Sequence, residues 1–488
     1  FFLRGQGGAL RPRGAGARVG GLPLHMAREG RARPAPCFRM LAKLLAAAIW
    51  TAGCPVEGNR LKAFRRRGKQ HPCGKQHPLP GDEHRIVSIA DLHGDFERAL
   101  SLLKALGLVN KVANDKNYNT MDDLWTGGKT RLVQLGDVLD RGRHGRLLYL
   151  FLWRLQDQAV KHKGEVILLI GNHELMMTRG QVQDRFADYL DWCTYVMEEE
   201  TCEDSYKAQE EQSDLGFTLT PEDELQYKCK DVKKEGQVLI ADEPKTCHRR
   251  AWRITTAKDS TGEMGSEFRR RVLDGRIKML HEEPSAGLLF VHGGLTPETL
   301  DYMDRNAKDL TDQYSVVEAI NRRVQDLFRP DGDLSKSNPL VSEEDPSGPA
   351  WTRVADDQQG WAMQWHRRKK AENKANGGNG SKQEEAAPSP KERCESIMQV
   401  LARTGATTMV IGHNRQLDGI ARTKCGGHVV LTDTTISSGF PQRGNLMALE
   451  VTEPHDGNKQ EDWVVYPALD QPDRRCVPLS SLVGQEEA

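Results

Sequence analysis

Short runs of apolar residues recur along this chain, and polar or glycine residues bound each run. Runs of this length that are rich in β-branched side chains are typical of buried strands. The pattern predicts strands at 85–90, 130–135, 165–170, 286–291 and 406–411. Further strands are expected at 429–432, 446–451 and 463–466. Each run of the first set ends directly before a glycine, an aspartate or a histidine.

Two segments carry apolar residues at helical spacing. In the first, 96–106, the apolar positions lie three or four residues apart, and Gly107 is a suitable helix stop. The second predicted helix is 147–160. Strands that alternate with helices indicate an α/β fold, in which ligands bind beyond the carboxyl ends of the strands.

Two regions interrupt this alternation. Residues 176–280 are mostly charged and polar, and we expect a largely helical insertion there. Residues 369–391 are poor in apolar side chains and rich in Gly, Pro, Ser and charge, which predicts a disordered loop. The expected organisation is a single catalytic domain at 84–470, followed by a C-terminal tail at 471–488.

The amino-acid composition argues against only two classes of protein, those that bind nucleic acid through a strong net charge and those with a zinc ribbon. The chain has 69 basic and 69 acidic residues, so no global field favours nucleic acid. The ten cysteines form no CxxC pair, which argues against a zinc ribbon. A cluster within the predicted insertion is expected to hold unpaired thiols or disulfides, and it comprises Cys193, Cys202, Cys229 and Cys247.

Residues 1–83 are interpreted as a targeting or disordered N-terminal region. Arginine is frequent there, and Glu29 and Glu57 are the only acids before residue 80. After Met40 comes a short apolar run followed by small residues, as in a signal peptide, and it is too short for a stable membrane span. The alternative is a transit peptide for a plastid or mitochondrion. Without such targeting the protein would be cytoplasmic.

Five short motifs follow the predicted strands. They are ADLHG (90–94), GDVLDRG (136–142), GNHE (171–174), HGG (292–294) and GHN (412–414). Together they supply the oxygen and nitrogen donors Asp91, His93, Asp137, Asn172, His292 and His413. Because no cysteine is included, the set differs from a structural zinc site and suits two divalent metals. Strand ends gathered at one sheet edge would bring these donors together.

The order and content of these motifs resemble the calcineurin-like metallophosphatase superfamily. GDxxDRG followed by GNHE is typical of its phosphoprotein phosphatase group. The SxxDLHGD start at 88–95 and the PxWxR-like segment at 349–353 are similar to the Shewanella-like protein phosphatases. Two positions depart from the family pattern, since Ala90 replaces a glycine and Asn414 replaces a threonine.

The resemblance implies a metallophosphatase-type β-sandwich flanked by helices. It also implies two bound divalent metal ions, each of which would be Mn, Fe or Zn. Asp91 and His93 would bind the first ion, and Asp137 would bridge both. The second ion would be bound by Asn172, His292 and His413. A hydroxide between the two ions would then attack the phosphorus atom in line.

The same resemblance assigns roles to the remaining motif residues. His173 would be the general acid for the leaving oxygen, and Asp140 would hold its ring. Arg141 would bind two phosphate oxygens with its planar guanidinium. Arg353 is the candidate for a second phosphate arginine, and the amide of Asn172 would also contact phosphate.

Three functions remain open at this point. The first is a protein phosphatase, which acts on a phosphoprotein or another phosphoester, with its preference for Ser/Thr or Tyr undecided. The second is a dinucleoside polyphosphate hydrolase, which is typically a compact chain without a large insertion. The third is an inactive binding protein with the same fold, which the intact donor set disfavours. No nucleic acid partner and no stable membrane span are expected.

A chain that begins near Asp82 should fold and hydrolyse phosphate esters like the full-length protein. The reason is that the first predicted strand begins at Arg85 and the first predicted ligand is Asp91. Activity and solubility of the two chains provide the measurement. An insoluble short chain would make the upstream segment part of the fold. A fluorescent fusion of 26–80 that stayed diffuse in the cytosol would contradict the targeting interpretation.

Overall fold

The computed structural model describes residues 84–179, 181, 252, 263–334, 338–342, 347–355, 387–454, 459–469 and 475–484. All of them lie in the compact unit of residues 68–488. The predicted N-terminal region, most of the predicted insertion and residues 369–386 of the predicted loop lie outside the described residues. Their proposed structures therefore stay predictions, as does the state of the four cysteines in the insertion.

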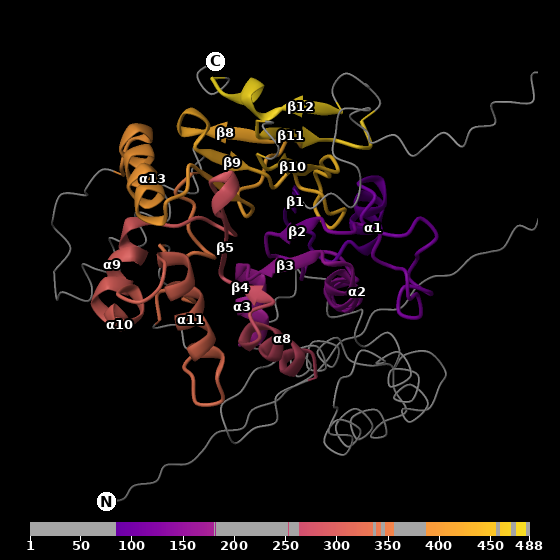
Figure 1. The fold of residues 1–488 in the computed structure, drawn as a ribbon, viewed down its shortest axis with the longest axis horizontal. Coiled ribbons are helices and arrows are strands. Elements are labelled where there is room, and N and C mark those ends of the chain that lie inside the picture. Colours follow the sequence, from indigo (N-terminus) through magenta and orange to yellow (C-terminus); the bar gives the residue numbers. More distant parts are fainter. Residues whose placement is uncertain are drawn as a thin grey trace, which may run out of the picture. The chain divides into compact units, whose positions relative to one another are not determined.

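The described residues form two β-sheets (Figure 1). The larger sheet has the order β12-β11-β10-β1-β2-β3-β4. Its strands are β1 (Arg85–Ile89), β2 (Arg131–Gln134), β3 (Glu165–Leu169), β4 (Ile277–Lys278), β10 (Ala448–Thr452), β11 (Glu461–Val465) and β12 (Cys476–Pro478). The smaller sheet has the order β5-β6-β7-β9-β8. Its strands are β5 (Leu280–Glu283), β6 (Leu288–Val291), β7 (Thr408–Ile411), β8 (Arg422–Lys424) and β9 (Val429–Leu431).

The two sheets pack face to face around a shared apolar core. Ile167 and Leu169 of β3 and Leu288 and Phe290 of β6 belong to this inner cluster. The residues between them in each strand, such as Leu289, belong to a second cluster that the helices cover. Since successive side chains point to opposite faces, both faces of these strands are buried. This explains why the sequence shows continuous apolar runs, and it confirms the predicted helix-flanked sandwich.

Helices cover the outer faces of both sheets (Figure 1). Beside the larger sheet lie α1 (Phe96–Ala105), α2 (Gly145–Ala159), α3 (Asn172–Thr178) and α8 (Glu263–Leu273). Beside the smaller sheet lie α9 (Pro297–Asn306), α10 (Lys308–Thr311), α11 (Val316–Phe328) and α13 (Pro390–Thr404). Short 3-10 turns occur at Val160–His162, Pro284–Ala286, Cys425–Gly427 and Leu479–Leu482. Among the helices described, none combines the length and the apolar character needed to cross a membrane.

Local capping explains where the helices begin. Asp95 caps α1 by accepting a hydrogen bond from the backbone N–H of Arg98 at 3.1 Å. Ser389 and Glu392 form a capping box at the start of α13, where Pro390 occupies the first turn. The predicted loop therefore ends before Pro390, and its expected boundary at residue 391 is wrong.

Two further boundaries differ from the sequence prediction. The strand expected at 286–291 begins at Leu288, because Pro284–Ala286 form a 3-10 turn and Gly287 adopts the left-handed φ of 66°. The expected tail beginning at residue 471 is also wrong. Cys476–Pro478 form β12, which pairs with β11 at the edge of the larger sheet.

A disulfide joins Cys394 of α13 to Cys425 in the turn between β8 and β9. The Cα atoms of the two cysteines are 5.3 Å apart, and 31 positions separate them along the chain. The cross-link therefore ties an outer helix to the edge of the smaller sheet. The sequence did not predict this pair, because only the cysteines of the predicted insertion lie close enough together in the sequence to form a recognisable cluster.

Replacing Glu450 by Ala should strongly destabilise the fold. Arg85 is fully buried, and its guanidinium contacts Glu450 at 2.5 Å and the carbonyl of Leu106 at 3.0 Å. Removing the carboxylate leaves a buried charge without its counterion, which costs about 3–5 kcal/mol. The free energy of unfolding in urea measures the loss. As a control, Asp304→Ala breaks the exposed pair with Arg403 and should cost about 0.2–1 kcal/mol. Equal losses in the two variants would contradict the prediction.

Candidate metal centre

The candidate donors follow the carboxyl ends of strands from both sheets. Asp91, Asp137 and Asn172 come shortly after β1, β2 and β3 of the larger sheet. His292 and His413 follow β6 and β7, which are neighbouring parallel strands of the smaller sheet. The chain thus places the donors where two sheet edges meet, as expected for an α/β fold.

Asp137 lies at the centre of the first group of donors. Its carboxylate is 3.6 Å from Nε2 of His93 and 3.8 Å from Nε2 of His173. Asp91 is 3.9 Å from the same Nε2 atom of His93. One donor atom each from His93, Asp137 and His173 lie within 4.8 Å of one another. Of these, His93 and Asp137 are predicted ligands of the first ion together with Asp91, whereas His173 faces the Asp137 carboxylate as the predicted general acid.

Asp137 also belongs to the second group. Its other carboxylate oxygen is 3.3 Å from Nε2 of His292, and the amide oxygen of Asn172 is 3.1 Å from that nitrogen. Donor atoms of Asp137, His292 and His413 lie within 4.8 Å of one another. The two groups therefore share one carboxylate, which is the arrangement that a pair of bridged metals requires.

Backbone carbonyls orient two of the imidazole rings. Nδ1 of His93 donates to the carbonyl of Leu139 at 2.9 Å, and Nδ1 of His292 donates to the carbonyl of Leu135 at 2.7 Å. Each bond leaves Nε2 directed at Asp137, as in metal sites where an outer hydrogen bond sets the tautomer of a ligand. Nε2 of His413 is buried and has no hydrogen-bond partner among the described residues. This orphaned nitrogen fits a metal ligand.

The pKa values of the histidines in the site also favour the binding of cations. Burial lowers the pKa of His93 to about 3, and burial together with Arg353 holds the pKa of His413 well below its usual value. Both rings are therefore neutral and able to act as ligands at neutral pH. Burial lowers the pKa of His292, but Asp137 and Asp91 outweigh it and raise the pKa to about 10. Positive charge is thus favoured between these two carboxylates.

His173 and Asp140 form the predicted pair. Nδ1 of His173 donates to Asp140 at 2.5 Å, so the ring presents Nε2 to the donor groups. Burial lowers the pKa of His173, but the carboxylates of Asp137 and Asp140 outweigh it and raise the pKa above the usual value. A raised pKa favours the protonated imidazole, and a general acid must hold a proton that it can donate.

The two candidate phosphate arginines lie at different sides of the site. Arg141 follows Asp140, and both adopt positive φ, 72° and 67°. Arg353 donates from Nη1 to the carbonyl of His413 at 3.0 Å and to the side chain of Asn414 at 3.3 Å. Asn414, the departure from the family pattern, therefore contacts the candidate phosphate arginine. The other departure, Ala90, has no positive φ and packs fully buried.

Sequence reasoning missed two buried carboxylates. Glu174 accepts hydrogen bonds from the backbone N–H groups of Gly171, Asp137 and Val138 at 2.8–3.0 Å, and so joins the second and third motifs. Glu174 is the last residue of the GNHE motif, so the motif itself could have identified this carboxylate. Asp433 is also buried, and burial together with the charge of Asp433 raises the pKa of Asp91. Burial raises the pKa of Asp433 itself to about 6.

Asp433 begins a loop, residues 433–445, that holds the first motif in place. Ser437 donates to the carbonyl of His93 at 2.9 Å, and Ser438 donates twice to Asp95 at 2.6–2.7 Å. The ring of Phe440 meets the His93 ring edge-on, with centroids 5.0 Å apart. No spacing in the sequence predicts these contacts, because they join segments far apart along the chain.

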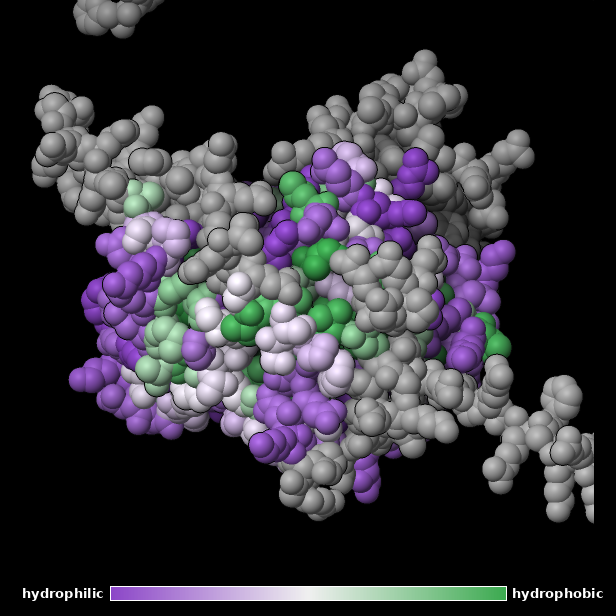
Figure 2. Space-filling view, turned by 90° about the horizontal axis from the view of Figure 1, so that it is seen from above, coloured by the Kyte–Doolittle hydropathy of each residue, from purple (hydrophilic) through white to green (hydrophobic). Residues whose placement is uncertain are grey.

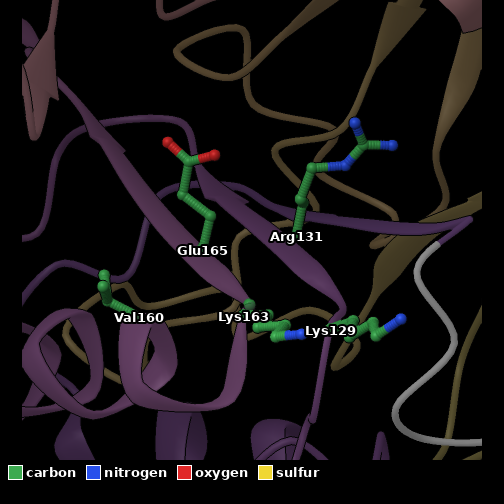
Figure 3. Close-up of a pocket in the computed structure, with 6 residues that line it drawn as sticks. Lys129, Arg131, Val160, Lys163 and Glu165 are labelled. Carbon is green, nitrogen blue, oxygen red and sulfur yellow. The ribbon is translucent and has the colours of Figure 1, made fainter.

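A surface pocket away from the site contains none of the candidate metal ligands among its lining residues (Figure 3). It lies at the amino ends of β2 and β3, and its charged lining comprises Lys129, Arg131, Lys163 and Glu165. Figure 3 shows Arg131 and Glu165 rising from the starts of these strands. Arg131 is already paired with Glu283 and Glu453. The metal donors follow the opposite ends of the strands, so the pocket is separate from the site.

Comparison with known proteins supports the resemblance inferred from the motifs. Residues 84–226 match the family model described as calcineurin-like phosphoesterase. An uncharacterized protein of Schizosaccharomyces pombe is 25% identical over 358 residues, which make up 73% of this chain and 74% of that protein. Shewanella-like protein phosphatase 2 of Arabidopsis thaliana is 36% identical over 115 residues. That match spans 22% of this chain and 27% of the Arabidopsis protein.

Among solved structures, a similar one is the cold-active protein-tyrosine phosphatase of a psychrophilic Shewanella species. The two chains are 16% identical and superpose with a TM-score of 0.44. The superposition covers 81% of this chain and 80% of that one.

Asp137→Asn should abolish tight binding of divalent metals. The neutral amide bridges two cations poorly, and this carboxylate is the one that both donor groups share. The metal content of purified protein after exposure to Mn²⁺, Fe²⁺ or Zn²⁺ provides the measurement. Asp418→Asn, which changes an exposed carboxylate paired with Arg422, should keep the parental metal content. Parental metal content in Asp137→Asn would contradict the shared role.

Proposed function

We propose that this chain is a dinuclear-metal phosphomonoester hydrolase that acts on phosphoproteins, because its residues 84–226 match the family model described as calcineurin-like phosphoesterase. The observation that carries the proposal is the carboxylate of Asp137, which lies in both groups of potential metal donors. Two divalent cations bound there would acidify a water molecule and neutralise the phosphate. Manganese, iron and zinc all suit a donor set of carboxylates, imidazoles and one amide.

The protein's own residues hold and orient the substrate. Arg141 presents a planar guanidinium on the side of His173, and Arg353 presents another on the side of His413. Two such forks suit the oxygens of one phosphate dianion. The amide of Asn172 is a third contact for phosphate in this proposal.

His173 supplies the proton for the leaving oxygen. Its Nδ1 atom is engaged by Asp140, so the transferable proton is on Nε2, which faces the donor groups. Asp140 orients the ring and stabilises its positive charge, as a carboxylate does in other hydrolases. The raised pKa of His173 favours the protonated ring, as a general acid requires.

The relatives favour a phosphoprotein as the substrate. The Arabidopsis protein that matches part of this chain is named a protein phosphatase. The choice between phosphotyrosine and phosphoserine or phosphothreonine is a matter for experiment. An assay in Mn²⁺, Fe²⁺ or Zn²⁺ should compare matched phosphopeptides of the three kinds with a dinucleoside polyphosphate. Turnover of the dinucleoside polyphosphate alone would replace the proposed substrate, and no turnover of any compound would favour a binding protein.

His173→Asn should slow the hydrolysis of alkyl phosphates far more than that of p-nitrophenyl phosphate. A good leaving group needs little protonation, whereas help from a general acid is typically worth about 10²–10⁴-fold in rate. The ratio of kcat values on the two esters provides the measurement. Asp140→Asn should change the ratio in the same direction by a smaller factor. An equal loss on both esters would show that His173 only positions phosphate.

A further inference from the structure

The ring of Phe440 is contacted by two arginines at the edge of the metal centre. The guanidinium carbon of Arg141 lies 5.1 Å from the ring centroid, and that of Arg415 lies 4.9 Å from it. Both distances are within the range of a cation–π interaction. The same ring is fixed by its edge contact with His93. Phe440 therefore holds two positive groups close to one candidate metal ligand.

Arg415 differs from the other two arginines of the site in its partners. Arg415 is exposed, and the structure shows no hydrogen bond from its side chain to any described residue. Its position is nevertheless defined, because it follows His413 by two residues and stacks on Phe440. Burial raises the pKa of Asp433, and the positive charge of Arg415 opposes that rise.

An exposed arginine is usually just solvated, and two features argue against that interpretation here. First, the aromatic contact restricts the side chain at the site rather than leaving it in bulk water. Second, Arg141 and Arg353 already provide two forks for one phosphate dianion, so Arg415 is a surplus positive charge. A surplus cation beside a phosphate site favours ligands that carry a further negative charge.

The distances limit where that further charge can be. Since both guanidinium carbons are near one ring centroid, they are at most about 10 Å apart. An extended peptide advances about 3.3 Å per residue. A carboxylate one or two residues from a phosphorylated side chain can therefore reach Arg415 while the phosphate contacts Arg141.

We propose that Arg415 binds an acidic side chain next to the phosphorylated residue, so that this phosphatase prefers acidic phosphopeptides. The inference rests on the proposed function and names its substrate class. Arg143 and Arg443 are exposed, and they belong to the two segments that meet where Arg141 contacts Phe440. An elongated acidic segment matches such a charge distribution better than a compact second phosphate does.

The test compares two phosphopeptides that differ only at the positions flanking the phosphoresidue, with Glu in one and Gln in the other. The parent enzyme should show a KM roughly two- to fivefold lower for the Glu peptide, as expected for an exposed charge contact. Arg415→Gln should bring the ratio of the two KM values close to one. Arg415→Lys should keep part of the preference, because it retains the charge and loses the planar fork. Raising the salt concentration should weaken the parental preference.

Arg322→Gln is the matched control. Arg322 lies on α11 and is also exposed, and its guanidinium lies 4.1 Å from the centroid of the ring of Tyr314, which precedes that helix. The substitution removes the same charge from the same kind of aromatic contact, so the preference for the Glu peptide should stay at the parental value. Circular dichroism of both variants establishes that they fold.

The outcomes separate this inference from the proposed function. If the parent hydrolyses both peptides with equal KM, or if Arg415→Gln keeps the preference, the role of Arg415 is overturned and the phosphatase stands. If neither peptide nor p-nitrophenyl phosphate is hydrolysed with any added metal, both proposals fail. If Arg415→Gln weakens only the hydrolysis of a dinucleoside polyphosphate, the second anion is a phosphate, and the peptide preference is overturned.

Discussion

Asp137 is the residue on which the arrangement of the site depends. Its carbonyl accepts hydrogen bonds from the backbone N–H groups of Leu92 and His93. Its own N–H donates to Glu174, and its carboxylate accepts from the N–H of His173. One residue thus connects the loops that follow β1, β2 and β3. The same carboxylate is shared by the two donor groups, so the hydrogen bonds that join the loops also position the centre of the metal site.

The loops adopt conformations that side chains ordinarily avoid. Of the eight described non-glycine residues with positive φ, five belong to the motifs: His93, Asp137, Asp140, Arg141 and His413. Each such residue costs of order 1–3 kcal/mol and persists only where its surroundings enforce it. In the motif loops, close packing of the backbone enforces these positive φ angles. A Cβ on Gly171 would lie 2.2 Å from Asp137, and one on Gly439 would lie 2.6 Å from the backbone of Arg141.

Much of the sandwich was predictable because its central strands are buried on both faces and follow one another in short α/β units. The candidate donors were also predictable, since each follows a strand end. Other elements left no comparable pattern. β12 and β8 have three residues each, too few to show a period. Contacts in the loop 433–445 depend on tertiary packing, so the position of Phe440 between His93, Arg141 and Arg415 could not be read from spacing. Arg353 was placed by family resemblance, and its neighbours became visible only in three dimensions.

The disulfide between Cys394 and Cys425 encloses β7 together with His413 and Arg415. A closed loop of this length restricts the unfolded chain, and in the chain-entropy description it stabilises the native state by roughly 3–4 kcal/mol. That contribution exists only while the sulfurs are oxidised. The half of the site built on the smaller sheet is therefore coupled to the thiol–disulfide balance of the surrounding medium, and a reducing environment would withdraw part of its support without touching a single metal donor.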